Sequence, residues 1–419
     1  MKDPDKFLFV LQAVSAAVQI LASFFIGEIA KLVGSIKWVI ITLYLLSFAG
    51  NFLYSCGGAV SSGTLLGGRI ICGAASASGA IIFSYITSVT KERVIVFKLV
   101  AMFRTAAGIF MALSQVVAIL CGLLDFKVQG YRITSYNAPT FASGFIILAV
   151  CLLLIFNLEN PKVKSKRLKN SSFFGAVKQF FGMKRQRLLS CLILLWNMFL
   201  SSFIMSEVVY FMPIFLTLNI GWDTKFQGVA FMVASILGVA GSYFAPKLKN
   251  IKILSRKKNE AKMDNSDSNG TEKPERNESE GAKEDSLYVK QVNFTIFALL
   301  LLLIGQAIMI GASEASTHNS LHPTNAGIFF VTGLTIAMLG YNFMASSVPA
   351  LFSMSIDANL KLRLMPSIGA ISGVGKLVAP IVLAALYKTE LGLPIAVGFG
   401  MMLVSVSMPT LFWIRVKRY

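Results

Sequence analysis

Long apolar segments alternate with short polar ones along almost the whole chain. A helix needs about 20 consecutive apolar residues to cross a bilayer, and these segments have that length. The pattern predicts eleven spans, at residues 7–26, 38–56, 64–90, 97–124, 141–158, 188–218, 227–246, 292–312, 327–353, 364–387 and 391–416. We therefore expect an all-α polytopic membrane protein built from helical bundles.

A strongly basic segment divides these spans into five before it and six after it. Its basic side chains are Lys162, Lys164, Lys166, Arg167, Lys169, Lys178, Lys184, Arg185 and Arg187. A segment of this charge does not enter hydrocarbon, and beside membrane spans it normally stays in the cytosol. We expect an N-terminal bundle at residues 1–158, a cytosolic linker at 159–187 and a C-terminal bundle at 188–419.

A second polar segment, residues 247–290, lies within the C-terminal half. It is rich in charged residues, Ser and Asn and poor in aromatic residues, which favours a disordered loop. Most of the 39 Lys and Arg residues fall in this loop, in the linker and in the other loops on the same side. This asymmetry places the loop and the C-terminus in the cytosol and the N-terminus on the opposite side. The sequons at Asn269 and Asn277 would be used only if the loop were lumenal.

The composition narrows the class of protein. Hydrophobic residues make up 55% and charged residues 14% of the chain, whereas soluble proteins are about 25% charged. A net charge of +19 would suggest a nucleic-acid partner in a soluble protein. Here the positive-inside rule accounts for it, so we expect a lipid bilayer around the protein and no nucleic acid.

Residues for enzyme chemistry are scarce. The five cysteines show no metal-ligand spacing and lie in or beside apolar spans. The two histidines, His318 and His322, share one loop and cannot form a hydrolytic centre by themselves. They either sense an acidic lumen or are simply solvated. We expect no catalytic residues, no metal site and no cofactor.

Four charged residues lie more than a few positions inside the predicted spans. At the bilayer centre a charge costs about 2.5–3.5 kcal/mol on insertion scales. Glu207 and Lys376 each lie about midway along a span and are expected to pair across helices. The pair either binds solute or couples protons, or it is a structural ion pair. Arg69 either attracts an anion or bonds backbone carbonyls. Arg104 either belongs to the pathway or snorkels toward the cytosol.

Uncharged polar residues also interrupt the apolar spans. The ones that we single out as candidates are Tyr85, Tyr210, Tyr341 and Asn342. Such groups either contact a solute or form hydrogen bonds between helices. Together with the four charged residues they define the candidate pathway for a small solute and for protons.

Several motifs resemble those of one transporter family. Residues 69–73 (RIICG) are similar to the R-x-x-x-G pattern in the fourth helix of the major facilitator superfamily. Glu207 with Pro213 resembles the acidic residue and proline of its seventh helix, and residues 372–380 (SGVGKLVAP) resemble its eleventh. The similarity covers nearly the whole chain and is strongest to the lysosomal branch of the superfamily, which is associated with a ceroid lipofuscinosis.

The resemblance implies a fold of twelve helices in two bundles, with both ends in the cytosol. Such folds are internal repeats with a solute site near the membrane midplane, and they work by alternating access. Asp3 and Pro4 resemble the loop after the family's first helix, so span 7–26 corresponds to the second helix. The first helix then has no counterpart in this sequence, which explains five spans before the linker and six after it.

Two family features are altered. The loop after the first predicted span resembles the family's gating loop and keeps Gly27 and Gly34. Lys31 stands where the family has an acidic or amide residue. In the fifth helix, residues 112–113 (Ala-Leu) replace a Gly-Pro pair. These changes weaken motifs that the family uses for gating.

These observations favour a secondary transporter for a small solute. The cations Arg69, Arg104 and Lys376 outnumber Glu207, which points to an anionic or zwitterionic solute. The alternatives are a non-transporting membrane scaffold or degenerate paralogue, and an anion-conducting pore. By resemblance we expect an endosomal or lysosomal membrane, with the plasma membrane as the alternative.

Overall fold

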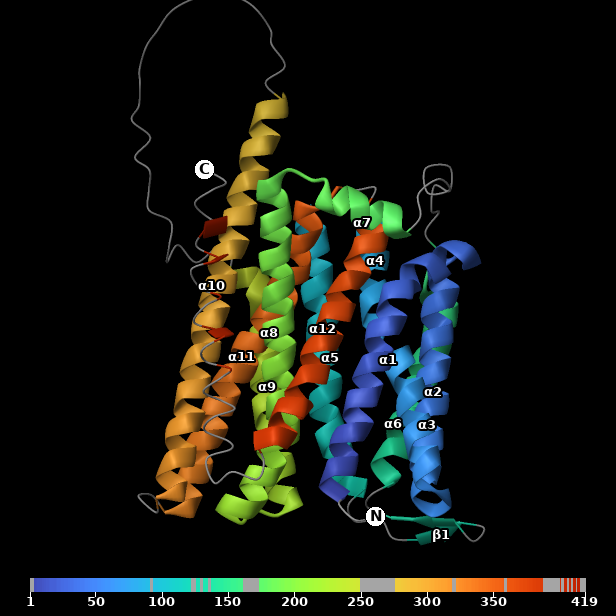
Figure 1. Cartoon of the computed structure of the whole chain (residues 1–419), viewed down its shortest axis with the longest axis vertical. Coiled ribbons are helices and arrows are strands. Elements are labelled where there is room, and N and C mark those ends of the chain that lie inside the picture. Colours follow the sequence, from blue (N-terminus) through green and yellow to red (C-terminus); the bar gives the residue numbers. More distant parts are fainter. Residues whose placement is uncertain are drawn as a thin grey trace, which may run out of the picture.

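The computed structural model describes residues 4–90, 93–121, 126–128, 131–134, 137–160, 173–248, 276–318, 322–357 and 360–386, with isolated positions between 400 and 414. Long helices lie side by side along one axis and make up most of the fold (Figure 1). In chain order the elements are α1 (Pro4–Val33), α2 (Ile36–Val60), α3 (Ser62–Ala75), α4 (Ser78–Val89), α5 (Arg93–Cys121), β1 (Phe126–Val128), β2 (Tyr131–Ile133), α6 (Ala138–Asn157), α7 (Phe173–Phe181), α8 (Arg185–Phe215), the π-helix η2 (Leu216–Ile220), α9 (Thr224–Leu248), α10 (Arg276–Thr317), α11 (Pro323–Ser355) and α12 (Lys361–Leu386).

The polytopic helical fold is confirmed. Among the described residues, nine helical segments are long and apolar enough to cross a membrane, and α9 contains a shorter apolar stretch at Phe226–Gly241. Together they coincide with every predicted span up to residue 387. The last predicted span, 391–416, lies outside the described residues except for isolated positions.

The first helix is longer than predicted, and the expected loop after it is largely helical. α1 continues to Val33, so Gly27 and Lys31 lie in its last turns. It ends at Gly34, whose φ of 71° is left-handed and therefore suits a glycine. The Ser35 hydroxyl then accepts a hydrogen bond from a backbone N–H in the first turn of α2. Of the predicted gating residues, Gly27 and Lys31 are thus held on a helix, and Gly34 lies at its end.

The third predicted span, residues 64–90, is divided. α3 and α4 meet at Ser76, whose hydroxyl donates to the carbonyl of Cys72 (2.9 Å). A serine that bonds back to its own helix competes with the helical pattern and often bends the chain. The two helices still form one candidate span, Ser62–Val89.

Two polar segments outside the predicted membrane spans contain helix. α7 lies in the basic linker and crosses one end of the bundle, against α12 (Figure 1). α10 begins at Arg276, so the insert predicted to be disordered is helical from there, and Asn277 of one sequon lies in this helix. Glu, Ala and Lys residues favour helix here, and extending an existing helix costs little. Asn269 and residues 161–172 lie outside the described residues.

A short hairpin connects α5 and α6. β1 and β2 are antiparallel, with Phe126 opposite Ile133 and Val128 opposite Tyr131. The hairpin lies at the opposite end of the fold from α7, near the start of α1 (Figure 1). If α7 is cytosolic, as the charges of the linker predict, the hairpin and the start of α1 face the other side.

The helices before the linker pack on one another, and so do those after it. α2 packs on α3 and α6, and α1 packs on α3, whereas α11 packs on α8, α9 and α10. The two halves meet where α1 and α4 contact α12 and where α5 contacts α9 and α11. We call this surface the interface between the halves. The largest cluster of buried apolar residues lies mainly in α8, α10 and α11.

α10 and α11 approach closely at three glycines. A Cβ atom added to Gly305 would lie 2.5 Å from Ala337 N and 2.6 Å from Gly333 O. One added to Gly340 would lie 2.7 Å from Ala298 O. Side chains do not fit at such distances, so the glycines let the two backbones touch, as is common between membrane helices.

Replacing Gly305 by alanine is expected to destabilise the protein by about 1–3 kcal/mol, because the methyl group would force α10 and α11 apart. Gly311→Ala in the same helix is the matched control, since an added Cβ there meets nothing within 4 Å. Alanine at that position should stabilise the helix by up to about 1 kcal/mol. Thermal unfolding of both variants in detergent, followed by size-exclusion chromatography, measures the difference. Equal unfolding midpoints would contradict the close approach.

Candidate functional site

α1 and α12 run antiparallel along the interface between the halves. A Cβ added to Gly373 would lie 2.8 Å from Ile20 Cγ1, and one added to Gly369 would lie 3.2 Å from Ser23 Oγ. Residue numbers therefore rise along α1 as they fall along α12. The two glycines allow close contact between the halves at this point, so neighbouring polar side chains lie between two parts that a transporter would move.

Two basic side chains from opposite halves approach each other at this interface. Lys376 of α12 donates to Gln19 Oε1 of α1 (3.5 Å). Arg104 of α5 lies over the ring of Phe83, with Cζ 5.2 Å from the ring centroid. Arg104 also interacts electrostatically with Lys376 and with Tyr341 of α11. We call Arg104, Tyr341 and Lys376 the cationic cluster.

No carboxylate of the described residues balances the positive charge of the cationic cluster. The buried Nε of Arg104 has no hydrogen-bond partner among the described residues. None of the ion pairs in the described part of the chain involves Arg104 or Lys376. Like charges held together inside a membrane repel each other. A negatively charged group bound between them would remove that repulsion.

The Arg104 guanidinium lies over the face of the Phe83 ring, which attracts a cation. Phe83 is itself held by an edge-to-face contact with Phe103, with ring centroids 5.8 Å apart. The place of Arg104 in a solute pathway stays a prediction.

The expected pair of Glu207 and Lys376 does not form. Both carboxylate oxygens of Glu207 lack hydrogen-bond partners in the described part of the chain, and Lys376 faces Gln19. The two residues differ in depth. A Cβ added to Gly375 would lie 2.9 Å from Phe203 N, and Glu207 follows about 6 Å further along α8 at 1.5 Å per residue. The prediction of an ion pair is therefore wrong.

Two other predicted residues contact their own half. Arg69 stacks on Tyr54 of α2, with Cζ 4.2 Å from the ring centroid. This is a cation–π contact that holds α3 on α2. The Tyr85 hydroxyl donates to the backbone carbonyl of Glu159 (3.1 Å), at the start of the linker. Neither contact involves the cationic cluster.

The remaining predicted residues have local roles or undescribed side chains. Asn342 Nδ2 donates to Met338 O in its own helix (2.9 Å). Tyr210 lies in α8, and its side chain is outside what the structure describes. His322 caps α11 by accepting a hydrogen bond from a backbone N–H, and His318 is exposed.

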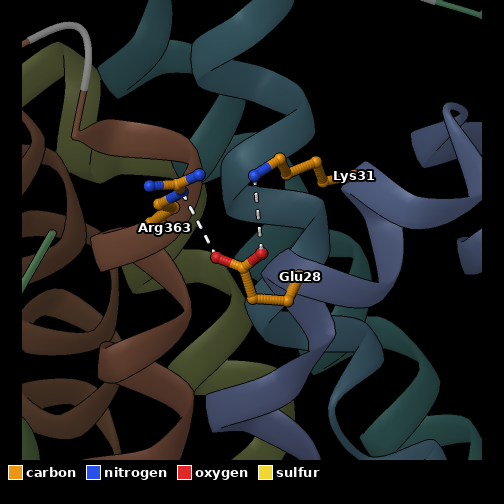
Figure 2. A network of polar contacts seen from close by, with 3 residues as sticks. All are labelled: Glu28, Lys31 and Arg363. Carbon is orange, nitrogen blue, oxygen red and sulfur yellow. Dashed lines mark ion pairs between the residues drawn. The ribbon is translucent and has the colours of Figure 1, made fainter. Parts of the chain in front are cut away.

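A carboxylate links the two halves at the end of the fold that carries α7. Glu28 of α1 lies 3.4 Å from Arg363 Nε of α12 and 3.9 Å from Lys31 Nζ of its own helix (Figure 2). Figure 2 shows the carboxylate between the two basic groups. The Arg363 side chain is 3% exposed and that of Glu28 is 25% exposed. We call Glu28, Lys31 and Arg363 the α1–α12 bridge.

The sequence analysis missed Glu28 and Arg363. Lys31 drew attention because it stands where the family has an acidic or amide residue, and the structure shows that a carboxylate lies one turn earlier, at Glu28. The spacing of Glu28 and Lys31 is typical of a pair on one helical face. No signal in one sequence indicates that the end of α1 meets the start of α12.

Two groups of helices, most of them long and apolar enough to cross a membrane, define the class of polytopic helical membrane proteins. A family model described as "Major Facilitator Superfamily" matches residues 7–257, and the chain belongs to this superfamily. It is 63% identical over 414 residues to the "MFS-type transporter PUL3" of Kluyveromyces lactis, covering 99% of this chain and 89% of that one. The identification from the motifs is confirmed at the level of the superfamily.

Solved structures share the fold at low identity. The human organic anion transporter MFSD10 aligns with a TM-score of 0.65 and 15% identity, over 96% of this chain and 83% of that one. The proton:xylose symporter XylE, bound to a sugar analogue, aligns with a TM-score of 0.62 and 13% identity, over 95% of this chain and 85% of that one. At such identities the comparison shows a common fold and leaves the solute open.

Proposed function

We propose that this protein is a secondary transporter that moves a small anionic or zwitterionic solute by alternating access, with protons as the coupling ion. The observation that carries the proposal is the cationic cluster. Arg104 belongs to one half and Lys376 to the other, and no carboxylate of the described residues neutralises them. An anion between them would contact both halves at once.

This placement links binding to movement. A ligand shifts a conformational equilibrium only if it binds the two states differently. The distance between Arg104 and Lys376 changes when the halves rock, so an anion held by both would favour the state in which they are close. Alternating access in such folds is largely a rigid-body rocking around a site between the repeats. The α1–α12 bridge would then close one end of the pathway.

The titles of two structures with this fold support the two parts of the proposal. MFSD10 is described as an organic anion transporter and XylE as a proton:xylose symporter. Neither title says anything about this chain directly. They show that this fold accommodates anionic solutes and proton coupling.

Uptake by purified protein in proteoliposomes tests the proposal. A panel of labelled carboxylates, phosphorylated metabolites and amino acids would be offered with and without an inward proton gradient. The proposal expects saturable uptake of an anionic or zwitterionic member, exchange against unlabelled solute, and stimulation by the gradient. Current that never saturates would indicate an anion pore. Absence of flux for the whole panel would favour a scaffold.

The membrane of residence is part of the proposal. The resemblance to the lysosomal branch supports an endosomal or lysosomal membrane, with the plasma membrane as the alternative. A fluorescent tag at the C-terminus should therefore overlap with an acidic-compartment dye in living cells. A signal confined to the cell surface would contradict this location and leave the transport proposal intact.

A further inference from the structure

Two buried polar side chains without partners lie inside the second half of the fold. Glu207 of α8 is 3% exposed and Gln306 of α10 is 1% exposed. Both carboxylate oxygens of Glu207 and both polar atoms of the Gln306 amide lack hydrogen-bond partners within the described part of the chain. Buried polar groups are nearly always hydrogen-bonded, so two such side chains call for an explanation.

A glycine brings the two side chains together. A Cβ atom added to Gly400 would lie 2.5 Å from Gln306 Nε2 and 3.3 Å from Glu207 Oε2. The polar ends of both side chains therefore lie against the same residue, and a larger residue there would displace the amide. We call Glu207, Gln306 and Gly400 the Glu207 site.

The chemistry of the Glu207 site favours a neutral carboxyl group. An ionised carboxylate without a partner is costly in a membrane interior. No charged group of the described residues interacts with Glu207. On the helices packed against α8, Lys376 faces Gln19 and Tyr341 faces Arg104. The Glu207 carboxylate can therefore be neutralised only if it binds a proton or another cation.

The amide is a suitable partner for a protonated carboxyl. A carboxylic acid has one O–H donor and a free acceptor oxygen, and a primary amide has N–H donors and an acceptor oxygen. Each can thus satisfy the other without any charge. An ionised carboxylate could accept from the amide but would leave the amide oxygen without a donor.

We propose that Glu207 is a reversible proton-binding site, in which the protonated carboxyl and the Gln306 amide bond each other beside Gly400. Glu207 and Gln306 lie on α8 and α10, which are not among the helices by which we defined the interface between the halves. Ser202, on the same helix as Glu207, donates to Ser372 of α12 (2.7 Å), and α12 also carries Lys376. Coupling of this proton to solute movement through α8 rests on the proposed transport function. Proton binding at Glu207 by itself does not.

A pH jump applied to proteoliposomes on a solid-supported membrane tests the site without any solute. A proton that enters the Glu207 site moves charge into the membrane, so the wild type should give a transient current. Glu207→Gln should reduce the displaced charge by about tenfold or more, since glutamine cannot take up the proton. Glu314→Gln, at an exposed position of α10, is the matched control and should keep the current. Wild-type current that persists in Glu207→Gln would overturn the proposal.

A second measurement tests reversible proton binding on the wild-type protein, and one variant then tests the role of the amide. A hydrophobic carbodiimide adds to protonated carboxyl groups in membranes and leaves a stable N-acylurea, which peptide mass spectrometry can locate. Glu207 of the wild type should be labelled more strongly at acidic than at alkaline pH, and Gln306→Leu should change the midpoint of that dependence. Labelling that does not vary with pH would overturn reversible binding. An unchanged midpoint in Gln306→Leu would remove the amide from the site.

Discussion

Replacing Lys376 by glutamine is expected to lower the uptake of an anionic solute by about 10- to 100-fold, because hydrogen bonds to charged groups contribute about 1.5–3 kcal/mol. The ammonium group lies at the interface between the halves, bound only to Gln19 in the described residues. Glutamine keeps a polar, unbranched side chain, although a shorter one, and removes the charge. The loss should appear mainly in the apparent affinity, measured as the concentration for half-maximal uptake.

Two further variants make the test specific. Lys376→Arg retains the charge and should keep most of the uptake. Lys98→Gln is the matched control, because Lys98 is an exposed cation on α5, the helix that carries Arg104. If Lys376→Gln transported as well as Lys98→Gln, the cationic cluster would not be the solute site.

A double-mutant cycle tests whether Arg104 binds the same anion as Lys376. If Arg104 and Lys376 hold the same anion, the second neutralisation should cost much less than the first, since the site is already lost. Uptake by Arg104→Gln, by Lys376→Gln and by the double variant gives the coupling. Strictly additive losses would mean that the two cations act at separate places.

The span pattern was predictable because hydropathy is a local property of the chain. A bilayer requires each crossing segment to satisfy its own backbone, so apolar length alone places a helix. The helical start of α10 at Arg276 was missed for the converse reason. Its composition resembles that of a disordered loop, and only the adjoining span makes helix extension cheap.

The site was harder to predict because it depends on helix rotation and relative depth. Glu207 and Lys376 both lie near the middle of their predicted spans, yet one faces Gln306 and Gly400 and the other faces Gln19. Predicted span ends are uncertain by several residues, and each residue shifts the depth by about 1.5 Å and the direction by about 100°. An ion pair is predicted correctly only if the depth and the direction of both side chains are correct.

The direction of the Arg104 side chain was also not predictable from the sequence. The sequence analysis left open whether this cation reaches the membrane surface or stays in the pathway. Its guanidinium lies over the ring of Phe83, an aromatic residue of the preceding helix α4. Tertiary contacts of this kind leave no trace in the spacing of one chain.

Replacing Arg363 by glutamine is expected to open the end of the fold that carries α7. The variant removes the ion pair that joins α1 to α12 (Figure 2). Glu28 is partly exposed, so we expect the loss to be about 1–2 kcal/mol, below the value for a fully buried pair. This corresponds to a change of about 5- to 30-fold in the ratio of open to closed molecules. Spin labels at Leu32 and Arg185, both exposed and on opposite halves, would report a longer distance.

A charge exchange separates electrostatics from packing in the α1–α12 bridge. Glu28→Arg alone should open this end strongly, because it places a third cation beside Lys31 and Arg363. Combining it with Arg363→Glu restores an attractive pair and should recover much of the closed population. Lys37→Gln is the control, because Lys37 Nζ donates to Ile155 O (2.8 Å) within the first half only. Two results together would contradict this role of the bridge: the exchanged pair does not recover closure, and Arg363→Gln has the wild-type distance distribution. They would show that apolar contacts between α1 and α12 hold this end shut. In that case Lys31 and Arg363 would only orient the Glu28 side chain and would not control access to the pathway. The close contacts at Gly369 and Gly373 would then set how the halves rock.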